Sequence, residues 1–143
     1  MTERNYDSNQ VILTVDGVTV EGRPDGAFCS FSAPDDDFGE VEGNGGDLTR
    51  FRVNKRKGEL TVNVMYGTSG HALLGSLATA DLQTGRGAFA VRLVDVNGGF
   101  EVSAPKCYIR KRPDIEIGPE PGALEYMIVM PSYTRRDGEL ARL

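Results

Sequence analysis

The side chains best suited to chemistry in this sequence are a single histidine, two cysteines and a run of acids. His71 is the only histidine, and Cys29 and Cys107 lie far apart in the chain. A structural zinc site needs four clustered His or Cys ligands, and a redox dithiol needs a Cys-x-x-Cys pair, which is absent here. We therefore expect two reduced, half-buried thiols rather than a disulfide, and a histidine that is solvated or bonded locally.

The acidic run Asp35, Asp36 and Asp37 invites a calcium interpretation. An EF-hand loop needs glycine at its sixth position and glutamate at its twelfth, and this stretch has neither. The sequence also contains no G-x-S-x-G elbow and no glycine motif that would cradle a phosphate, and a lone histidine gives little basis for a nucleophile triad. The sequence predicts no catalytic residue, metal or cofactor, and hence no enzyme.

Composition narrows the class of protein further. The 143 residues fit one domain, spanning 1–143, that can bury a core without disulfides or a metal. With 16 basic and 21 acidic residues the net charge is −5, which argues against a general binder of nucleic acid or anionic membranes. The first ten residues are polar and are not expected to form a signal peptide, and no apolar run is long enough for a membrane span.

The charge is unevenly placed along the chain. Residues 1–46 hold ten acids and two bases, a net charge of −8, whereas the remaining residues hold 14 bases and 11 acids, a net charge of +3. Complementary patches of this kind steer and orient the association of copies, although they are also compatible with ordinary solvated surface. The candidate inter-subunit contacts are the acids Asp35, Asp36, Asp37, Glu40 and Glu42 and the bases Lys55, Arg56, Lys57, Arg110, Lys111 and Arg112.

Most of the chain alternates apolar and polar residues with period 2, which predicts strands with one face on a core. Hairpin turns are predicted at Asp16-Gly17, at 55–58 and at 97–99. The acidic, glycine-rich stretch 34–47 is predicted to be a long loop that orders against a partner. The predicted strands are 11–15, 18–20, 27–33, 48–54, 59–66, 88–96, 100–112, 115–117 and 124–130, followed by a polar tail at 132–143.

One segment changes period and predicts a helix at about 70–83. Ser69 is a candidate N-cap, leucines and alanines repeat at three and four residues, and Gly85 supplies a stop. The fold class predicted from these patterns is mainly β with one short flanking α-helix.

The order of these elements resembles the tail tube proteins of contractile-tailed bacteriophages, in the small phage structural protein family, over roughly residues 10–131. The resemblance rests on an ordered set of pieces rather than on one motif. These are the acidic stretch Ser32 to Asp47, the strand entry Lys57-Gly58-Glu59-Leu60-Thr61-Val62, the helix start Ser69-Gly70-His71-Ala72-Leu73-Leu74, the segment Arg110-Lys111-Arg112-Pro113-Asp114, and Leu124-Glu125-Tyr126.

The resemblance implies a tail-tube-type β-sandwich or β-barrel subunit that self-assembles into hexameric rings. Hairpins of six subunits would close one barrel around a channel, and stacked rings would carry DNA during ejection without binding it specifically. The implied partners are further copies of the chain and the sheath, baseplate and tail terminator proteins, with no membrane anchor. The implied location is the virion tail, assembled in the host cytoplasm.

The alternation of side chains predicts which faces line that channel. If the helix covers the apolar sides of 48–66 and 88–109, their polar sides face the channel. The lumen-facing candidates are Glu59, Thr61, Asn63, Arg92, Glu101 and Ser103.

Two other functions remain open at this point. The chain could be a different phage tail component, or a tube subunit of a phage-related injection machine, with the same fold. It could also be a monomeric β-sandwich binding module, although the absence of tryptophan and the presence of only five tyrosines leave few stacking platforms for a sugar.

Overall fold

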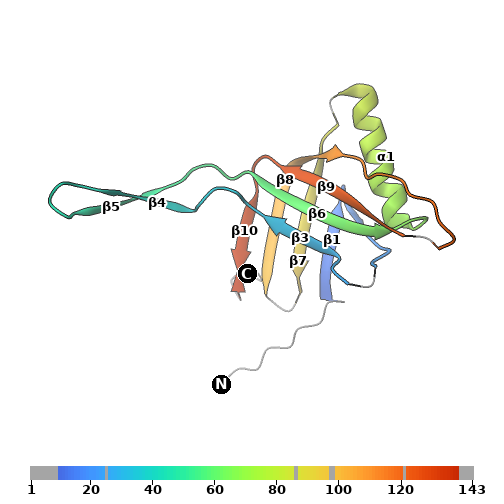
Figure 1. Cartoon of the computed structure of the whole chain (residues 1–143), viewed down its shortest axis with the longest axis horizontal. Coiled ribbons are helices and arrows are strands. Elements are labelled where there is room, and N and C mark those ends of the chain that lie inside the picture. Colours follow the sequence, from blue (N-terminus) through green and yellow to red (C-terminus); the bar gives the residue numbers. More distant parts are fainter. Residues whose placement is uncertain (1–9, 25, 86, 97–98, 121, 139–143) are drawn as a thin grey trace, which may run out of the picture.

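A computed structural model of the chain describes residues 10–24, 26–85, 87–96, 99–120 and 122–138. Figure 1 shows a body of two crossing layers of strands, a helix at one side of it, and a hairpin that extends far from it. The elements in chain order are β1 (Val11–Val15), β2 (Val18–Thr19), β3 (Cys29–Ser32), β4 (Phe38–Glu42), β5 (Leu48–Arg52), β6 (Gly58–Met65), α1 (Ser69–Thr84), β7 (Phe89–Asp95), β8 (Phe100–Lys111), β9 (Ala123–Met130) and β10 (Thr134–Asp137).

The long strand β8 belongs to both layers of the body. Its first part pairs with β10 and, as far as Cys107, with β7, with a register shift between Ala104 and Cys107, and its end from Tyr108 pairs with β9. The strand order is β2-β1-β7-β8-β9-β6-β3, and every pairing is antiparallel. Because a bulge bends a strand and increases its twist, β8 can carry the chain from one layer into the other.

The core lies between the two layers and follows the period-2 pattern. Along β6 the side chains alternate strictly, with Leu60, Val62 and Val64 fully buried and Thr61 and Asn63 partly exposed. Each fully buried Val, Leu or Ile contributes about 1.5–3 kcal/mol relative to an exposed one. The core side chains of the other strands are Leu13, Val15, Phe89, Val91, Leu93, Val102, Ala104, Cys107, Leu124, Tyr126, Ile128 and Met130.

The helix α1 confirms the segment predicted at 70–83. Its N-cap is Thr68 rather than Ser69, since the Thr68 hydroxyl accepts the backbone N–H of His71, and Gly85 ends it in the left-handed conformation at φ 69°. Leu74 belongs to the same core cluster as the side chains between the layers. The helix therefore closes one side of the core, instead of covering an outer sheet face as the sequence led us to expect.

Gly70 makes the docking of α1 possible, and replacing it is expected to destabilise the fold. A Cβ at this position would collide with the backbone carbonyl of Glu21 and lie 3.1 Å from a methyl carbon of Val20. We expect Gly70→Ala to lower the free energy of unfolding by about 1–3 kcal/mol, measured by urea denaturation. Gly75→Ala is the matched control in the same helix, because its Cβ would meet only the Tyr126 hydroxyl, at 3.3 Å. Equal stability of the two variants would contradict this account of helix packing.

The predicted hairpin that joins 48–54 to 59–66 is wrong. Strand β5 pairs with β4, whereas β6 pairs with β3 and β9. Residues 55–57, which resembled a turn, instead connect a separate two-stranded sheet to the body. Part of the acidic stretch 34–47, predicted to be a loop, is consequently strand β4.

The two other predicted hairpins are present, whereas residues 115–117 and the polar tail differ from the prediction. Strands β1 and β2 join at Asp16 and Gly17, both with positive φ (53° and 78°), as a tight hairpin turn requires. Strands β7 and β8 pair as predicted, and residues 97 and 98 of their turn lie outside the described residues. The prediction of a strand at 115–117 is wrong, and the predicted polar tail contains β10, which pairs with β8; residues 139–143 lie outside the described part.

Candidate assembly interface

The described residues offer little support for a catalytic or metal-binding site. No group of three or more His, Cys, Asp or Glu side chains is arranged there to hold a metal ion, and no described helix is long and apolar enough to cross a membrane. His71 is neither free nor bonded only to its neighbours in sequence, since its Nδ1 lies 3.0 Å from the hydroxyl of Tyr126 on β9 and its ring lies 5.4 Å from that of Tyr66. The histidine therefore ties the start of α1 to β9.

The two cysteines are free thiols, as predicted. Cys29 is half-buried and Cys107 is buried, which is more than the half-burial expected for it. Burial raises the pKa of each thiol from 9.0 to about 11, partly offset at Cys29 by the charge of Arg23 and at Cys107 by a backbone hydrogen bond from Val91. Because the thiolate is the nucleophile, both thiols are poorly reactive near neutral pH.

These thiols should make the fold sensitive to alkali. In the unfolded chain they ionise near pH 9.0 and in the folded protein near pH 11, so the unfolded state releases protons first. Stability is therefore expected to be lost as the pH rises from about 9 to about 11. Urea titrations at several pH values should show a shallower loss for Cys29→Ala/Cys107→Ala than for the natural chain. A loss of equal steepness would mean that other groups carry the effect.

The strands β4 and β5 form an arm, residues 38–52, that stands away from the body (Figure 1). One side of the arm is charged, because Glu40 faces Arg50 across the strands and Arg50 also lies 4.6 Å above the ring of Phe38. On the other side, Phe51 covers Gly39, where a Cβ would collide with the ring. Four large apolar side chains of the arm are about half exposed or more, namely Phe38, Val41, Leu48 and Phe51.

The arm depends on contacts that its own chain does not supply. Its two strands pair only with each other among the described strands, and an isolated two-stranded hairpin is marginally stable in water. Its base is fixed to the body, since Val53 donates to the Asp37 carbonyl and Tyr133 donates to the Arg56 carbonyl. Beyond this base, no described residue of the chain buries the exposed apolar side chains, so the arm is a candidate interface.

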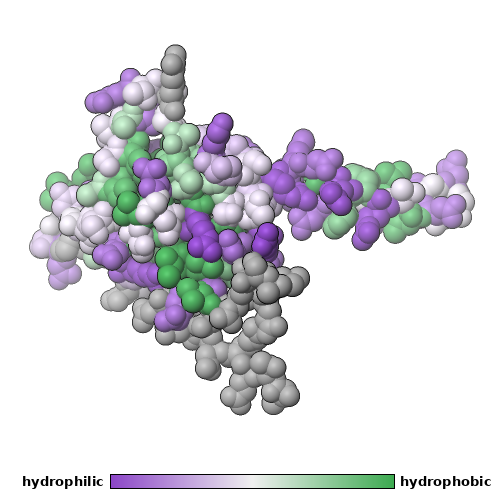
Figure 2. Space-filling view, turned by 180° about the vertical axis from the view of Figure 1, so that it is seen from behind, coloured by the Kyte–Doolittle hydropathy of each residue, from purple (hydrophilic) through white to green (hydrophobic). Residues whose placement is uncertain are grey.

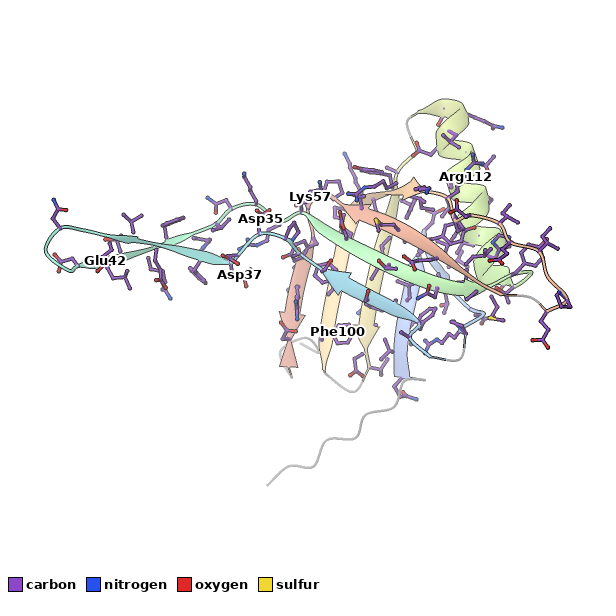
Figure 3. The ribbon with its side chains drawn as sticks, in the orientation of Figure 1. Asp35, Asp37, Glu42, Lys57, Phe100 and Arg112 are labelled. Carbon is purple, nitrogen blue, oxygen red and sulfur yellow. The ribbon has the colours of Figure 1, made fainter. Side chains whose placement is uncertain are left out.

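The candidate contact charges fall into three groups in space (Figure 3). Asp35, Asp37 and Lys57 lie at the junction of arm and body, Glu42 lies towards the arm tip, and Arg112 lies on the far side beside α1. Of the remaining candidates, Asp36, Lys55 and Arg56 belong to the junction, Glu40 belongs to the arm, and Arg110 and Lys111 end β8.

Some of these charges are already paired within one chain. Arg56 lies 4.0 Å from Asp37, Arg110 lies 2.6 Å from Glu59, and Lys111 lies 3.9 Å from Asp114. Such exposed pairs contribute about 0–1 kcal/mol each, so they leave the bases able to exchange partners. The structure thus brings acidic and basic candidates together at the junction, while the arm acids and the β8 bases lie at opposite ends of the molecule (Figure 3).

The six lumen-facing candidates lie on two different layers. Glu59, Thr61 and Asn63 project outward from the layer of β3, β6 and β9, since they alternate with buried residues. Arg92, Glu101 and Ser103 project outward from the layer of β1, β7, β8 and β10, where Arg92 and Glu101 are 3.1 Å apart. Because the core lies between the layers, the two sets point in opposite directions.

Sequence reasoning missed a second apolar surface beside α1. Leu82, Ile115 and Ile117 are 66%, 72% and 85% exposed, although Leu82 fitted the apolar stripe of the helix and the two isoleucines fitted a strand. A signal was present in the alternation Asp114-Ile115-Glu116-Ile117, in which each isoleucine follows an acid. That pattern is typical of a strand edge or of a contact surface, and only the structure shows which of the two interpretations is right.

Comparison with known proteins supports the fold. No protein-family profile and no curated protein match this sequence. Solved structures do match, including the tube-terminating cap of the anti-feeding prophage (10% identity, 96% of this chain and 95% of that chain, TM-score 0.61). A chain of the sheath–tube complex of the PVC extracellular contractile injection system in its extended state is also similar (10% identity, 94% and 93%, TM-score 0.62). The sheath/tube terminator of that system is similar too (11% identity, 95% and 99%, TM-score 0.57).

At these identities the likeness concerns the fold alone, and it extends over nearly the whole chain. The predicted fold class, mainly β of the tail-tube type with one short α-helix, is confirmed.

Proposed function

We propose that this chain is a structural, non-enzymatic subunit of a contractile phage-like tail, and specifically of a tail tube built from stacked hexameric rings. The observation that carries the proposal is the arm, whose apolar side chains are exposed in a chain with the fold of contractile-system components. Closing strands of several copies into one barrel removes the free edges that would otherwise aggregate.

In its most specific form, the proposal is a bacteriophage tail tube through which DNA passes. A net charge of −5 suits that role, because a basic wall would bind phosphates and hold the DNA in the channel. Sheath, baseplate and tail terminator proteins would be its partners in the virion tail. The same subunit would serve an injection machine that carries other cargo.

We further propose that the layer of β3, β6 and β9 faces the channel. The arm leaves the body between β3 and β6, so an arm held by a neighbour brings the edge of this layer, strand β3, next to the neighbour's body. Strand β3 ends the strand order, pairing only with β6 among the described strands, and so offers a free edge for continuing the sheet. Glu59, Thr61 and Asn63 would then line the channel, and Arg92, Glu101 and Ser103 would lie outside.

A terminator or cap is the second candidate function. Two of the three similar structures described above are terminating components, with coverage as complete as that of the sheath–tube chain. A cap forms one ring and stops growth, whereas a tube subunit stacks ring upon ring.

Gel filtration and negative-stain imaging of the purified chain test these proposals together. Tubes of variable length are expected for a tube subunit, and single rings for a cap. A 15.5 kDa monomer at high protein concentration would contradict both and favour the binding module.

A further inference from the structure

A groove beside α1 lies across the body from the arm. It has a volume of about 920 Å³ and runs between the second half of α1 and the end of β8 with the segment that follows it. Figure 1 shows α1 and the arm on opposite sides of the body, and Figure 3 places Arg112 beside α1. The residues used below are Ala78, Leu82, Ile109, Arg112 and Ile115, all of which line the groove.

The groove combines apolar side chains with a small excess of positive charge, since its lining holds three bases and two acids, Asp81 and Asp114. Leu82 and Ile115 are 66% and 72% exposed, and Ala78 and Ile109 lie beside them. Arg112 has no ion-pair partner among the described residues, whereas Lys111 is paired only with the highly exposed Asp114. The groove therefore suits an occupant that carries apolar side chains next to free carboxylates.

The outer half of the arm has those properties. Leu48 is 62% exposed and lies directly opposite Glu42 across the strands, and Glu40 and Glu42 form no ion pair within the part of the chain described. Figure 2 shows hydrophobic surface along the arm between strongly hydrophilic patches. Exposed apolar side chains rimmed by polar ones mark interaction sites.

We propose that the arm of one copy docks in the α1 groove of a second copy. Leu48 packs against Leu82 and Ile115, and Glu40 and Glu42, which share its face of the arm, lie near Arg112. This inference rests on the proposed function, and it names the acceptor that the arm engages. Because arm and groove are different surfaces, the contact is head-to-tail, a type that closes into rings or extends into filaments.

Another hollow of similar size is a poorer acceptor for the acidic arm. It lies at the arm's own base, where the acids Asp35, Asp36, Asp37 and Asp137 outnumber the two bases of its lining, Arg56 and Arg135. Like charges brought together at an interface oppose association, so the acidic half of an arm is repelled there.

A cysteine pair tests the contact directly. In Leu48→Cys/Leu82→Cys, with Cys29 and Cys107 retained because they are shielded, mild oxidation of assembled protein should give a ladder of cross-linked multimers on a non-reducing gel. Leu48→Cys/Ser76→Cys is the matched control, since Ser76 is exposed on the same helix but does not line the groove. A ladder in both pairs, or in neither, would overturn the proposed acceptor.

Charge reversal with rescue tests the same contact without cross-linking. Glu40→Arg/Glu42→Arg and Arg112→Glu should each raise the protein concentration needed for assembly by roughly tenfold, and their combination should restore most of that loss. Normal tubes without the specific cross-link and without rescue would overturn the acceptor but leave the tube function standing. A chain that never forms multimers would overturn both.

Discussion

Replacing residues 38–52 with a short Gly-Ser linker is expected to give a folded monomer that no longer assembles. The arm lies outside the core, and among the described strands β4 and β5 pair only with each other, so the body keeps its buried side chains. Burying a Val, Leu or Phe is worth about 1.5–3 kcal/mol, and each 1.4 kcal/mol is about tenfold in affinity. Because the arm's four apolar side chains are already about half buried, their loss should weaken assembly by about a hundredfold or more.

The result is read by gel filtration, negative-stain imaging and thermal unfolding of the same sample. Val41→Ser/Leu48→Ser keeps the hairpin length and should also stay monomeric, whereas Thr49→Ser should assemble normally. Tubes of ordinary length from the armless variant would show that strand pairing between bodies is sufficient, and that the arm is not the interface.

The parts of this fold that sequence predicted are those that local signals specify. Asp16-Gly17 identifies a hairpin because both residues adopt positive φ, and the leucine repeat before Gly85 identifies α1 because no strand has that period. Strands β7 and β8 follow from alternation on both sides of a glycine turn. Each of these elements pairs or packs with a neighbour in sequence.

Such local signals could not identify strand partners that are distant in sequence. Lys55-Arg56-Lys57-Gly58 resembles a hairpin turn, yet β6 pairs with β9, more than fifty residues later. Every residue of β5 is exposed, so burial never imposed on it the alternation that would have identified its partner. The packing of the complete core decides which of several compatible strands pair, and a local sequence pattern carries no information about that packing.

Only part of the candidate interface could be predicted from the sequence, because a local pattern does not show which charged residues meet in space. Charge segregation identified the acids of the arm and the bases at the end of β8, but it could not show that Asp37 already lies beside Arg56 or Glu59 beside Arg110. Alternation shows whether a side chain points into the core or out of it. Alternation does not show which of the two outer faces of the body a side chain occupies. For this reason the sequence predicts that Thr61 and Ser103 line the same channel.

Thiol labelling of those two positions distinguishes the faces. With Cys29 and Cys107 replaced by alanine, Thr61→Cys and Ser103→Cys place one thiol on each layer, at positions that are both half-buried in the subunit. In assembled tubes, a small maleimide should label both thiols, while a bulky polymer-linked maleimide should label Ser103→Cys and spare Thr61→Cys.

Adding Val41→Ser/Leu48→Ser provides the control, because the bulky reagent should reach both thiols once the protein is monomeric. Protection of Ser103→Cys alone would place the layer of β1, β7, β8 and β10 inside the channel. Equal labelling of both thiols by the bulky reagent in intact tubes would mean that neither layer forms the wall. These outcomes exclude one another because the two outer faces of a two-layer body cannot both face the same axis.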